Sequence, residues 1–129
     1  MTPLPQDFLD LLAQHDEVLV SSREGTTLGT VRAWFVIAPP GVVYVFGFGF
    51  SERARRWRSD PWVRLRVPGR QEAVEGVAYF VRPDELDRVA PLVVERWAMQ
   101  GAPTLDGLRR TLRDGVHVLV RVEGQQPQA

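Results

Sequence analysis

The chain has 129 residues, of which 44% are hydrophobic and 25% are charged, and this composition favours one globular domain spanning residues 1–129. Sixteen basic and sixteen acidic residues cancel, so the molecule as a whole is not a polyelectrolyte. The sequence contains neither Cys nor Lys, which excludes thiol nucleophiles, thiolate metal sites, Schiff-base lysines and the P-loop lysine. No apolar stretch reaches the length of a membrane span, and we expect a soluble cytoplasmic protein with no membrane partner.

A helix is predicted over residues 3–15, because apolar side chains recur there at helical spacing. They are Leu4, Phe8, Leu11 and Leu12. Three strands are predicted after it. The first opens at 18–20 and turns at 23–25, the second covers 31–37, and the third covers 42–48. A Pro-Pro-Gly run at 39–41 separates the second strand from the third.

The middle of the chain predicts a capped helix followed by a hairpin. Ser51 can accept from the free amides of a helix that ends near residue 59, since Pro61 prevents its continuation. Strands are predicted at 62–67 and 72–81. If Gly69 and Arg70 form a two-residue turn, two cross-strand pairs follow. They are Leu65 with Val74 and Arg64 with Glu75.

Two further helices and a last strand complete the predicted fold. A helix beginning at Pro83 and ending at Gly101 has one apolar stripe. The stripe contains Leu86, Val89, Ala90, Val93 and Trp97. Thr104 caps a shorter helix with Leu105, Leu108 and Leu112 on one side, and residues 116–122 form a strand before a polar tail. This order predicts an α+β, mainly β protein, a six-stranded antiparallel barrel, closed or nearly closed, with flanking helices.

The run from residue 46 to residue 61 contains part of the RNA-recognition signature. Gly-Phe-Gly-Phe at 47–50 matches the middle of that signature. Phe46 stands where a basic residue belongs and Ser51 where an aliphatic one does. The RNA-recognition fold also needs a helix between its first two strands, and residues 18–48 predict strands and turns alone. We therefore predict no nucleic-acid partner.

Two other motifs are incomplete in the same run. Gly47 and Gly49 match a dinucleotide-binding Gly-x-Gly-x-x-Gly, but Glu52 replaces the third glycine. Gly49 and Ser51 match the Gly-x-Ser-x-Gly elbow of hydrolases, but Arg53 breaks that pattern. No parallel sheet is predicted to support the first motif, and no histidine lies close in sequence to pair with Ser51. Neither motif predicts a catalytic residue.

An anion site is the interpretation that needs no named motif. Two glycines let another group approach the strand backbone, and the strand runs directly into a helix start bearing Ser51, Arg53 and Arg56. Hydroxyl, amide and guanidinium donors together suit a phosphate. Seven of the sixteen arginines lie at 53–70 with one acid among them, which predicts a locally positive surface. Arg32 lies inside an apolar strand, where its charge needs water or a counter-ion.

Three pieces of sequence support a family resemblance. Arg-Ala-Trp-Phe-Val covers 32–36, Val-Val-Tyr-Val covers 42–45, and Ser-Glu-Arg-Ala-Arg-Arg-Trp-Arg-Ser-Asp-Pro-Trp-Val covers 51–63. With these pieces, residues 21–67 resemble the pyridoxamine 5′-phosphate oxidase-like superfamily of split β-barrel flavoproteins. That superfamily also includes reductases dependent on the deazaflavin coenzyme F420.

The resemblance implies a homodimer that binds FMN, or alternatively F420, in a groove at the subunit interface. It implies an oxidoreductase that acts on a small organic substrate by hydride transfer. The phosphate would be held by Arg32, Ser51 and Arg53, with Arg56 of the anion site as a further donor. The isoalloxazine ring would lie along strand backbone near Trp34, Phe46 and Gly47.

Several residues depart from the usual pattern and leave alternatives open. Phe48 and Phe50 are bulky, so the groove is either open or filled by these two rings. A flavin performs the redox chemistry itself, so no catalytic residue and no metal are predicted, and His117 is interpreted as a surface or interface residue. The alternative function is a non-catalytic split-barrel dimer that binds a phosphorylated or other anionic small molecule.

Overall fold

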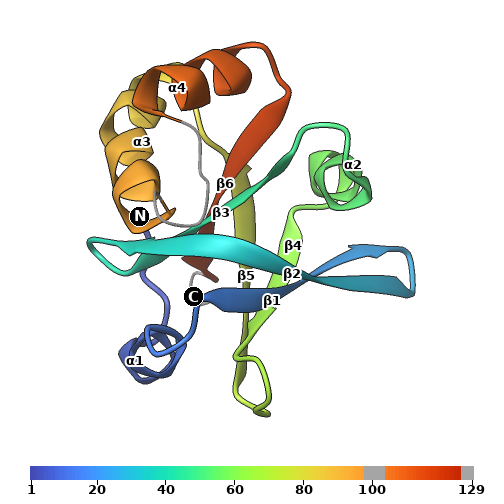
Figure 1. Cartoon of the computed structure of the whole chain (residues 1–129). Helices are drawn as coiled ribbons and strands as arrows, with labels where there is room; N and C mark the ends of the chain where they lie inside the picture. The colour runs from blue at the N-terminus through green and yellow to red at the C-terminus, as the bar shows by residue number, and fades with distance from the viewer. Residues whose placement is uncertain (98–103, 126–129) are drawn as a thin grey trace.

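The structure is a computed structural model that describes residues 1–97 and 104–125. Within these residues, strands and helices follow one another in the predicted order (Figure 1). The strands are β1 (Glu17–Glu24), β2 (Thr27–Ala38), β3 (Val42–Phe48), β4 (Trp62–Arg66), β5 (Ala73–Phe80) and β6 (His117–Gly124). The helices are α1 (Gln6–Leu12), α2 (Glu52–Ser59), α3 (Pro83–Trp97) and α4 (Leu105–Arg113). The predicted helix end at Gly101, and the side chains of Trp97 and Leu105, lie outside the described residues.

The strands form one closed barrel in the order β1-β2-β3-β6-β5-β4, and every neighbouring pair is antiparallel. The predicted six-stranded antiparallel barrel with flanking helices is therefore confirmed. Among the described residues, no helix is both long enough and apolar enough to cross a membrane.

Two element boundaries differ from the sequence prediction for clear physical reasons. Helix α1 begins at Gln6 rather than residue 3, because Pro5 is extended, with φ −57° and ψ 133°. Strand β2 begins at Thr27 rather than residue 31, because its pairing with β1 continues to the Glu24–Thr27 pair beside the turn. Gly25 takes φ 60° in that turn, a conformation that glycine adopts without strain.

The β4–β5 hairpin has the predicted register but a different turn. Leu65 pairs with Val74 and Arg64 with Glu75. The turn is centred on Pro68 and Gly69 rather than on Gly69 and Arg70, because the Arg70 amide donates to the Val67 carbonyl at 3.1 Å. Proline followed by a glycine with φ 76° is the signature of a type II turn.

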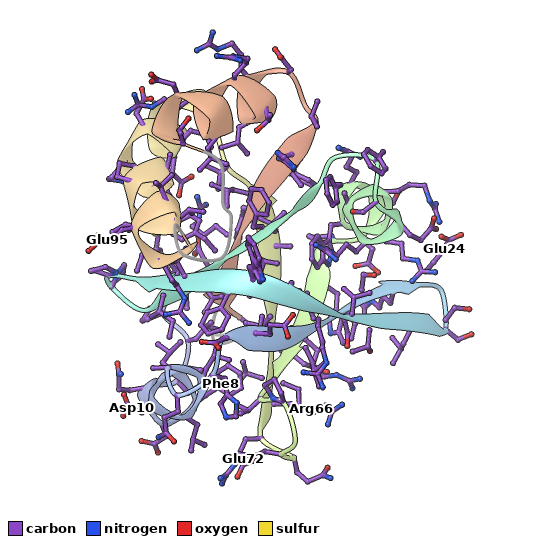
Figure 2. All side chains as sticks on the ribbon, in the orientation of Figure 1. Phe8, Asp10, Glu24, Arg66, Glu72 and Glu95 are labelled. Atoms are coloured by element: carbon purple, nitrogen blue, oxygen red, sulfur yellow. The ribbon has the colours of Figure 1, made fainter. Side chains whose placement is uncertain are left out.

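The main core fills the barrel, and helices close both of its ends. Alternate residues of the strands point inward, among them Val18, Phe35, Val45, Leu65 and Val120. Phe8 of α1, labelled in Figure 2, joins this core from one end and Trp57 of α2 joins it from the other (Figures 1 and 2). Each fully buried side chain of this size stabilises the fold by about 1.5–3 kcal/mol.

A second core lies outside the barrel, where α3 and α4 cover β2, β3 and β6. The predicted stripe of α3 supplies Val89, Ala90 and Val93, and α4 supplies Leu108. A buried hydrogen bond joins β3 to α3 across this layer. The Tyr44 hydroxyl donates to Glu85 Oε2 of α3 at 2.6 Å. Arg121 of β6 pairs with Glu85 and with Glu123, so both buried carboxylates are compensated by one guanidinium.

Strands β2 and β3 separate along part of their length. Their ladder joins Phe35–Ala38 to Val42–Val45, whereas Thr27–Trp34 pairs with β1 and Phe46–Phe48 pairs with β6. Helix α2 lies over the opening between the two strands (Figure 1). We call this opening, between residues 27–34 of β2 and 46–48 of β3, the β2–β3 split.

Candidate functional site

Helix α2 begins at the edge of the β2–β3 split because Ser51 caps it, as predicted. Ser51 is extended, with φ −68° and ψ 155°, and its Oγ accepts from the Ala54 amide at 3.2 Å. The helix stops at Ser59 because Asp60 returns to extended backbone before Pro61. A hydroxyl that accepts one hydrogen bond still carries its own proton, so Ser51 can donate to an anion.

Arg53 points into the split rather than out to solvent. Its Nη2 donates to the Phe46 carbonyl at 3.1 Å. The same atom lies 2.5 Å from where a Cβ at Gly47 would stand, so glycine is required for this close approach. Among the described residues, no carboxylate pairs with Arg53. Burial lowers the pKa of its guanidinium, which marks a desolvated and uncompensated cation.

Arg56 points to the other side of the split and has two carboxylates nearby, although its buried Nε makes no hydrogen bond. Its Nη1 takes the space that a side chain at Gly29 of β2 would need. Its Nε lies 3.9 Å from Glu24 Oε2 and 3.8 Å from Glu52 Oε1. Glu24 stands on the β1–β2 hairpin beside α2 (Figure 2). Arg56 therefore packs α2 against β2 and has less charge to offer a ligand than Arg53 has.

Arg32 and Trp34 lie on the outer face of β2. The Arg32 side chain is 61% exposed, and its Nη1 is 3.9 Å from Glu17 Oε1, so its charge is met by water and by a counter-ion. Trp34 stacks against Phe46 of β3, with 6.5 Å between ring centroids and 25° between planes. Of the four predicted phosphate donors, Ser51, Arg53 and Arg56 belong to α2 and its cap, whereas Arg32 lies on β2.

The Trp34–Phe46 pair continues into a row of aromatic rings along β3. Ring centroids are 4.8 Å apart for Phe46 and His117, 5.0 Å for His117 and Phe48, and 5.3 Å for Phe48 and Phe50. Phe48 is 49% exposed and Phe50 81% exposed. These two rings therefore point outward, and the side chain that fills the split is Arg53.

His117 belongs to this row, which sequence reasoning missed. It stands opposite Phe48 in the β3–β6 ladder. Its Nδ1 is buried without a hydrogen-bond partner, and burial lowers its pKa below the ordinary 6.5, so the imidazole is neutral at pH 7. Phe48 and His117 are 69 residues apart in the chain, so their pairing leaves no local signal, although both were predicted as strand residues.

The predicted positive surface around α2 is neutralised in part, by carboxylates from outside the segment that pair with Arg55, Arg56 and Arg70. Arg55 pairs with Glu24 and Glu52, and Arg70 with Glu72 at 2.9 Å. Two of these three pairs join residues no more than three apart in the chain, whereas Glu24 reaches α2 through the fold. Arg53 and Arg58 of α2 have no carboxylate partner among the described residues, and they donate to the carbonyls of Phe46 and Gly49.

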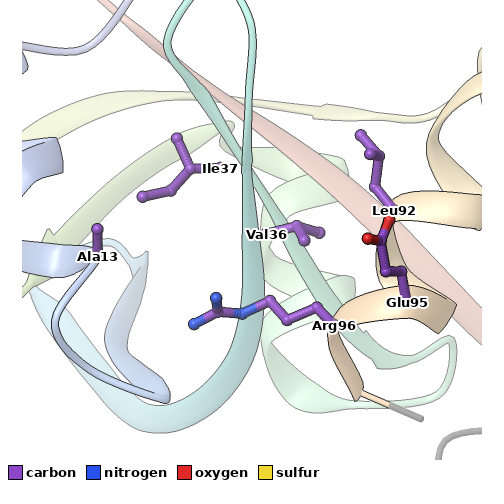
Figure 3. A pocket seen from close by; sticks show the side chains of 6 residues that line it. All are labelled: Ala13, Val36, Ile37, Leu92, Glu95 and Arg96. Atoms are coloured by element: carbon purple, nitrogen blue, oxygen red, sulfur yellow. The ribbon is translucent and has the colours of Figure 1, made fainter.

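A hollow of about 550 Å³ lies elsewhere in the described structure, between α1 and α3 (Figure 3). It is lined by Ala13, Val36, Ile37, Leu92, Glu95 and Arg96. Arg96 reaches toward the α1 side, where its Nη2 donates to the His15 carbonyl at 2.9 Å (Figure 3). None of the predicted site residues lines this hollow, so it is separate from the β2–β3 split.

No protein-family model and no curated protein matches the chain. Solved structures do match. The heme storage protein HutZ from Vibrio cholerae has a TM-score of 0.70 and 18% identity, over 98% of this chain and 93% of that one. A putative pyridoxamine 5′-phosphate oxidase from Listeria innocua has a TM-score of 0.66 and 15% identity, over 94% and 93%. An FAD-binding protein from Mesorhizobium loti has a TM-score of 0.64 and 14% identity, over 98% and 93%.

The chain has the split-barrel fold of the pyridoxamine 5′-phosphate oxidase-like proteins. Identities of 14–18% carry the fold and no activity. The structures that share it are described variously as flavin-binding, heme-storing and of unknown function. The chain spans 50% of the length of one of them, the Agrobacterium tumefaciens protein Atu2129.

Proposed function

We propose that the protein binds a flavin phosphate, FMN or the deazaflavin F420, in the β2–β3 split and uses it to transfer hydride with a small organic substrate. The proposal rests on the environment of Arg53. Its side chain is a partly buried guanidinium without a carboxylate partner, at the start of a helix and in an opening between two strands. An anion in the split would supply the counter-charge that the described protein does not.

The residues around the split suit a phosphate. Arg53 would exchange the Phe46 carbonyl for phosphate oxygens, and a guanidinium can donate two parallel hydrogen bonds to them. The Ser51 hydroxyl and the first amides of α2 add donors on the same side. When the guanidinium leaves, the space beside Gly47 becomes free, because glycine has no side chain to fill it.

The aromatic row suits the ring of a flavin. Trp34 and Phe46 form a stacked pair at the edge of the split, and their apolar faces would shield a planar ring from water. His117, next to Phe46, offers a neutral imidazole whose Nε2 can donate or accept one hydrogen bond. The bound flavin would supply the hydride chemistry, so the protein needs no nucleophile of its own.

We propose a homodimer as the working assembly. In a dimer, the exposed rings of Phe48 and Phe50 beside the split would be covered by the second copy rather than by water. The ligand would then lie between two protein surfaces, which excludes water from the reacting ring.

A second candidate function is non-catalytic binding of a phosphorylated or other anionic small molecule. The guanidinium of Arg53, which has no carboxylate partner among the described residues, favours this candidate. A guanidinium can bind any phosphate group, whatever the rest of the ligand is. The two candidates share one site and differ in whether the occupant carries redox chemistry.

The test is an absorbance spectrum of the purified protein after incubation with FMN, F420 or riboflavin and removal of the unbound excess. The proposal expects a retained flavin band with FMN or F420, a weaker one with riboflavin, and loss of retention in Arg53→Ala. Arg55→Ala is the matched control, because Arg55 lies exposed on the same helix. A colourless protein that inorganic phosphate still stabilises against heat would favour the second candidate, and a protein that responds to neither would contradict both. Light scattering of the loaded protein tests the dimer.

A further inference from the structure

A separate hollow of about 320 Å³ lies between α3 and α4, near the start of α3 and the end of α4. It is lined by Val81, Leu86, Asp87, Arg109, Leu112 and Arg113. The two helices lie side by side against the barrel in Figure 1, and the hollow is at the ends where α3 begins and α4 finishes. It shares no lining residue with the β2–β3 split.

The floor of the hollow is apolar and fixed in place. Val81, Leu86 and Leu112 are partly buried and pack against the outer core of the molecule. The Val81 amide donates to the Leu119 carbonyl of β6 at 3.0 Å, which holds this residue against the barrel. A ligand with an apolar body would cover side chains that are already half removed from water.

The rim of the hollow carries one more positive charge than negative. Arg109 and Arg113 are four residues apart on α4, so they share one helix face. Arg109 Nε lies 3.4 Å from Asp87 Oδ1, yet this Nε is buried and makes no hydrogen bond. Arg113 has no carboxylate partner among the described residues. One guanidinium is thus poorly satisfied and its neighbour is free.

We propose that this hollow binds a small organic carboxylate, with its apolar body on Val81, Leu86 and Leu112 and its carboxylate between Arg109 and Arg113. A guanidinium matches a carboxylate in planar, two-point geometry, and two of them on one helix face define where the charged group lies. The volume is at the lower end of the range of about 300–1,000 Å³ typical of ligand pockets, which sets the ligand at about the size of a substituted benzoate.

The test is a titration of the ¹⁵N-labelled protein with sodium benzoate, followed through the amide resonances. Saturable shifts are expected at the start of α3 and in the last turn of α4. Benzamide, which has the same ring and no charge, is expected to leave these resonances in place. Arg113→Ala should weaken benzoate binding about tenfold, the cost of a charge-assisted hydrogen bond at a partly exposed site. Asp87→Asn should strengthen binding, because it removes the competing carboxylate.

The control variant is Arg110→Ala, since Arg110 lies exposed on the same helix and does not line the hollow. Equal effects of Arg110→Ala and Arg113→Ala would overturn the proposal. Shifts that appear with benzamide as well, or that cluster at residues 51–53 at the start of α2 beside the β2–β3 split, would also overturn it. Arg53→Ala should leave benzoate binding at α4 unchanged, so this result is independent of the flavin test.

Discussion

The guanidinium of Arg53 occupies the space that a side chain at position 47 would need. Nη2 lies 2.5 Å from the Cβ position of Gly47 and 3.1 Å from the carbonyl oxygen of Phe46. Gly47 has no side chain, and the long side chain of Arg53 fills the space that this leaves. This relationship makes the two positions energetically dependent on each other.

Gly47→Ala is expected to lower the free energy of unfolding by about 1–2 kcal/mol, because the new methyl group displaces the guanidinium from its hydrogen bond. Urea denaturation measures the loss. In an Arg53→Ala background the same substitution should cost much less, since nothing remains for the methyl group to displace. Additive effects of the two substitutions would contradict the complementarity.

Ser51→Ala is expected to destabilise the protein by about 1 kcal/mol, because the Ala54 amide loses its acceptor at the start of α2. Ser51→Asp should retain most of the stability, since its carboxylate can accept from the same amide. Thr104→Ala is a matched comparison, because Thr104 caps α4 through the Gly107 amide at 3.2 Å. Urea midpoints of the three variants check the prediction. A loss in Ser51→Asp as large as in Ser51→Ala would show that capping is not the cause.

Because the pKa of Tyr44 is raised in the folded protein, we expect the protein to lose stability at alkaline pH. Burial, together with the hydrogen bond to Glu85, raises this pKa from the ordinary 10.0 to about 12. A pKa raised by folding stabilises the native state below the unfolded value, and this contribution is lost as pH rises from 10 toward 12. Thermal unfolding of the wild type and of Tyr44→Phe across this range measures the effect. Parallel stability curves for the two proteins would contradict it.

Arg121→Met is expected to cost about 3–5 kcal/mol, because it leaves Glu85 and Glu123 buried without their shared cation. Burial penalises the charged form of Glu123, and without Arg121 this cation no longer offsets that penalty. The variant should therefore recover stability as pH falls, and urea denaturation at pH 5 and pH 8 checks the sign. Arg88→Met is the control, since Arg88 is exposed and forms no ion pair among the described residues. A deficit equal at both pH values would refute the explanation.

The elements that sequence reasoning placed correctly depend on neighbours in the chain. Ser51 and Pro61 limit α2 through their own backbone preferences, and the alternation at residues 62–67 predicts the faces of β4. The β4–β5 register was predicted from a turn at Gly69 and Arg70, and it is correct although the turn is centred on Pro68 and Gly69. The local signals predicted a six-stranded antiparallel barrel, and the family resemblance identified it as a split barrel. Gly47 of β3 and Gly49 just after it were expected to admit a neighbouring group, and they do.

The local sequence does not indicate which groups approach these two glycines. Gly47 admits Arg53, whereas Gly49 admits the carbonyl of Gly115, from a turn that chain folding brings beside it. The direction of Arg53 depends on where α2 lies against β3, and the pairing of Arg55 and Arg56 with Glu24 depends on where the β1–β2 hairpin lies against α2. The sequence gives the number of charges in a segment, but the tertiary structure determines which opposite charges lie near them.

The β1–β2 hairpin has a long ladder of its own and short attachments to the barrel. Eight residue pairs join β1 to β2, whereas three join β1 to β4 and four join β2 to β3. Beyond these ladders the hairpin is held by core side chains such as Val18 and Val20, and by ion pairs from Arg23 to Asp60 and from Glu24 to Arg55. The placement of one wall of the β2–β3 split therefore depends partly on exposed ion pairs, and high salt is expected to weaken the attachment of the hairpin tip before it affects the barrel core.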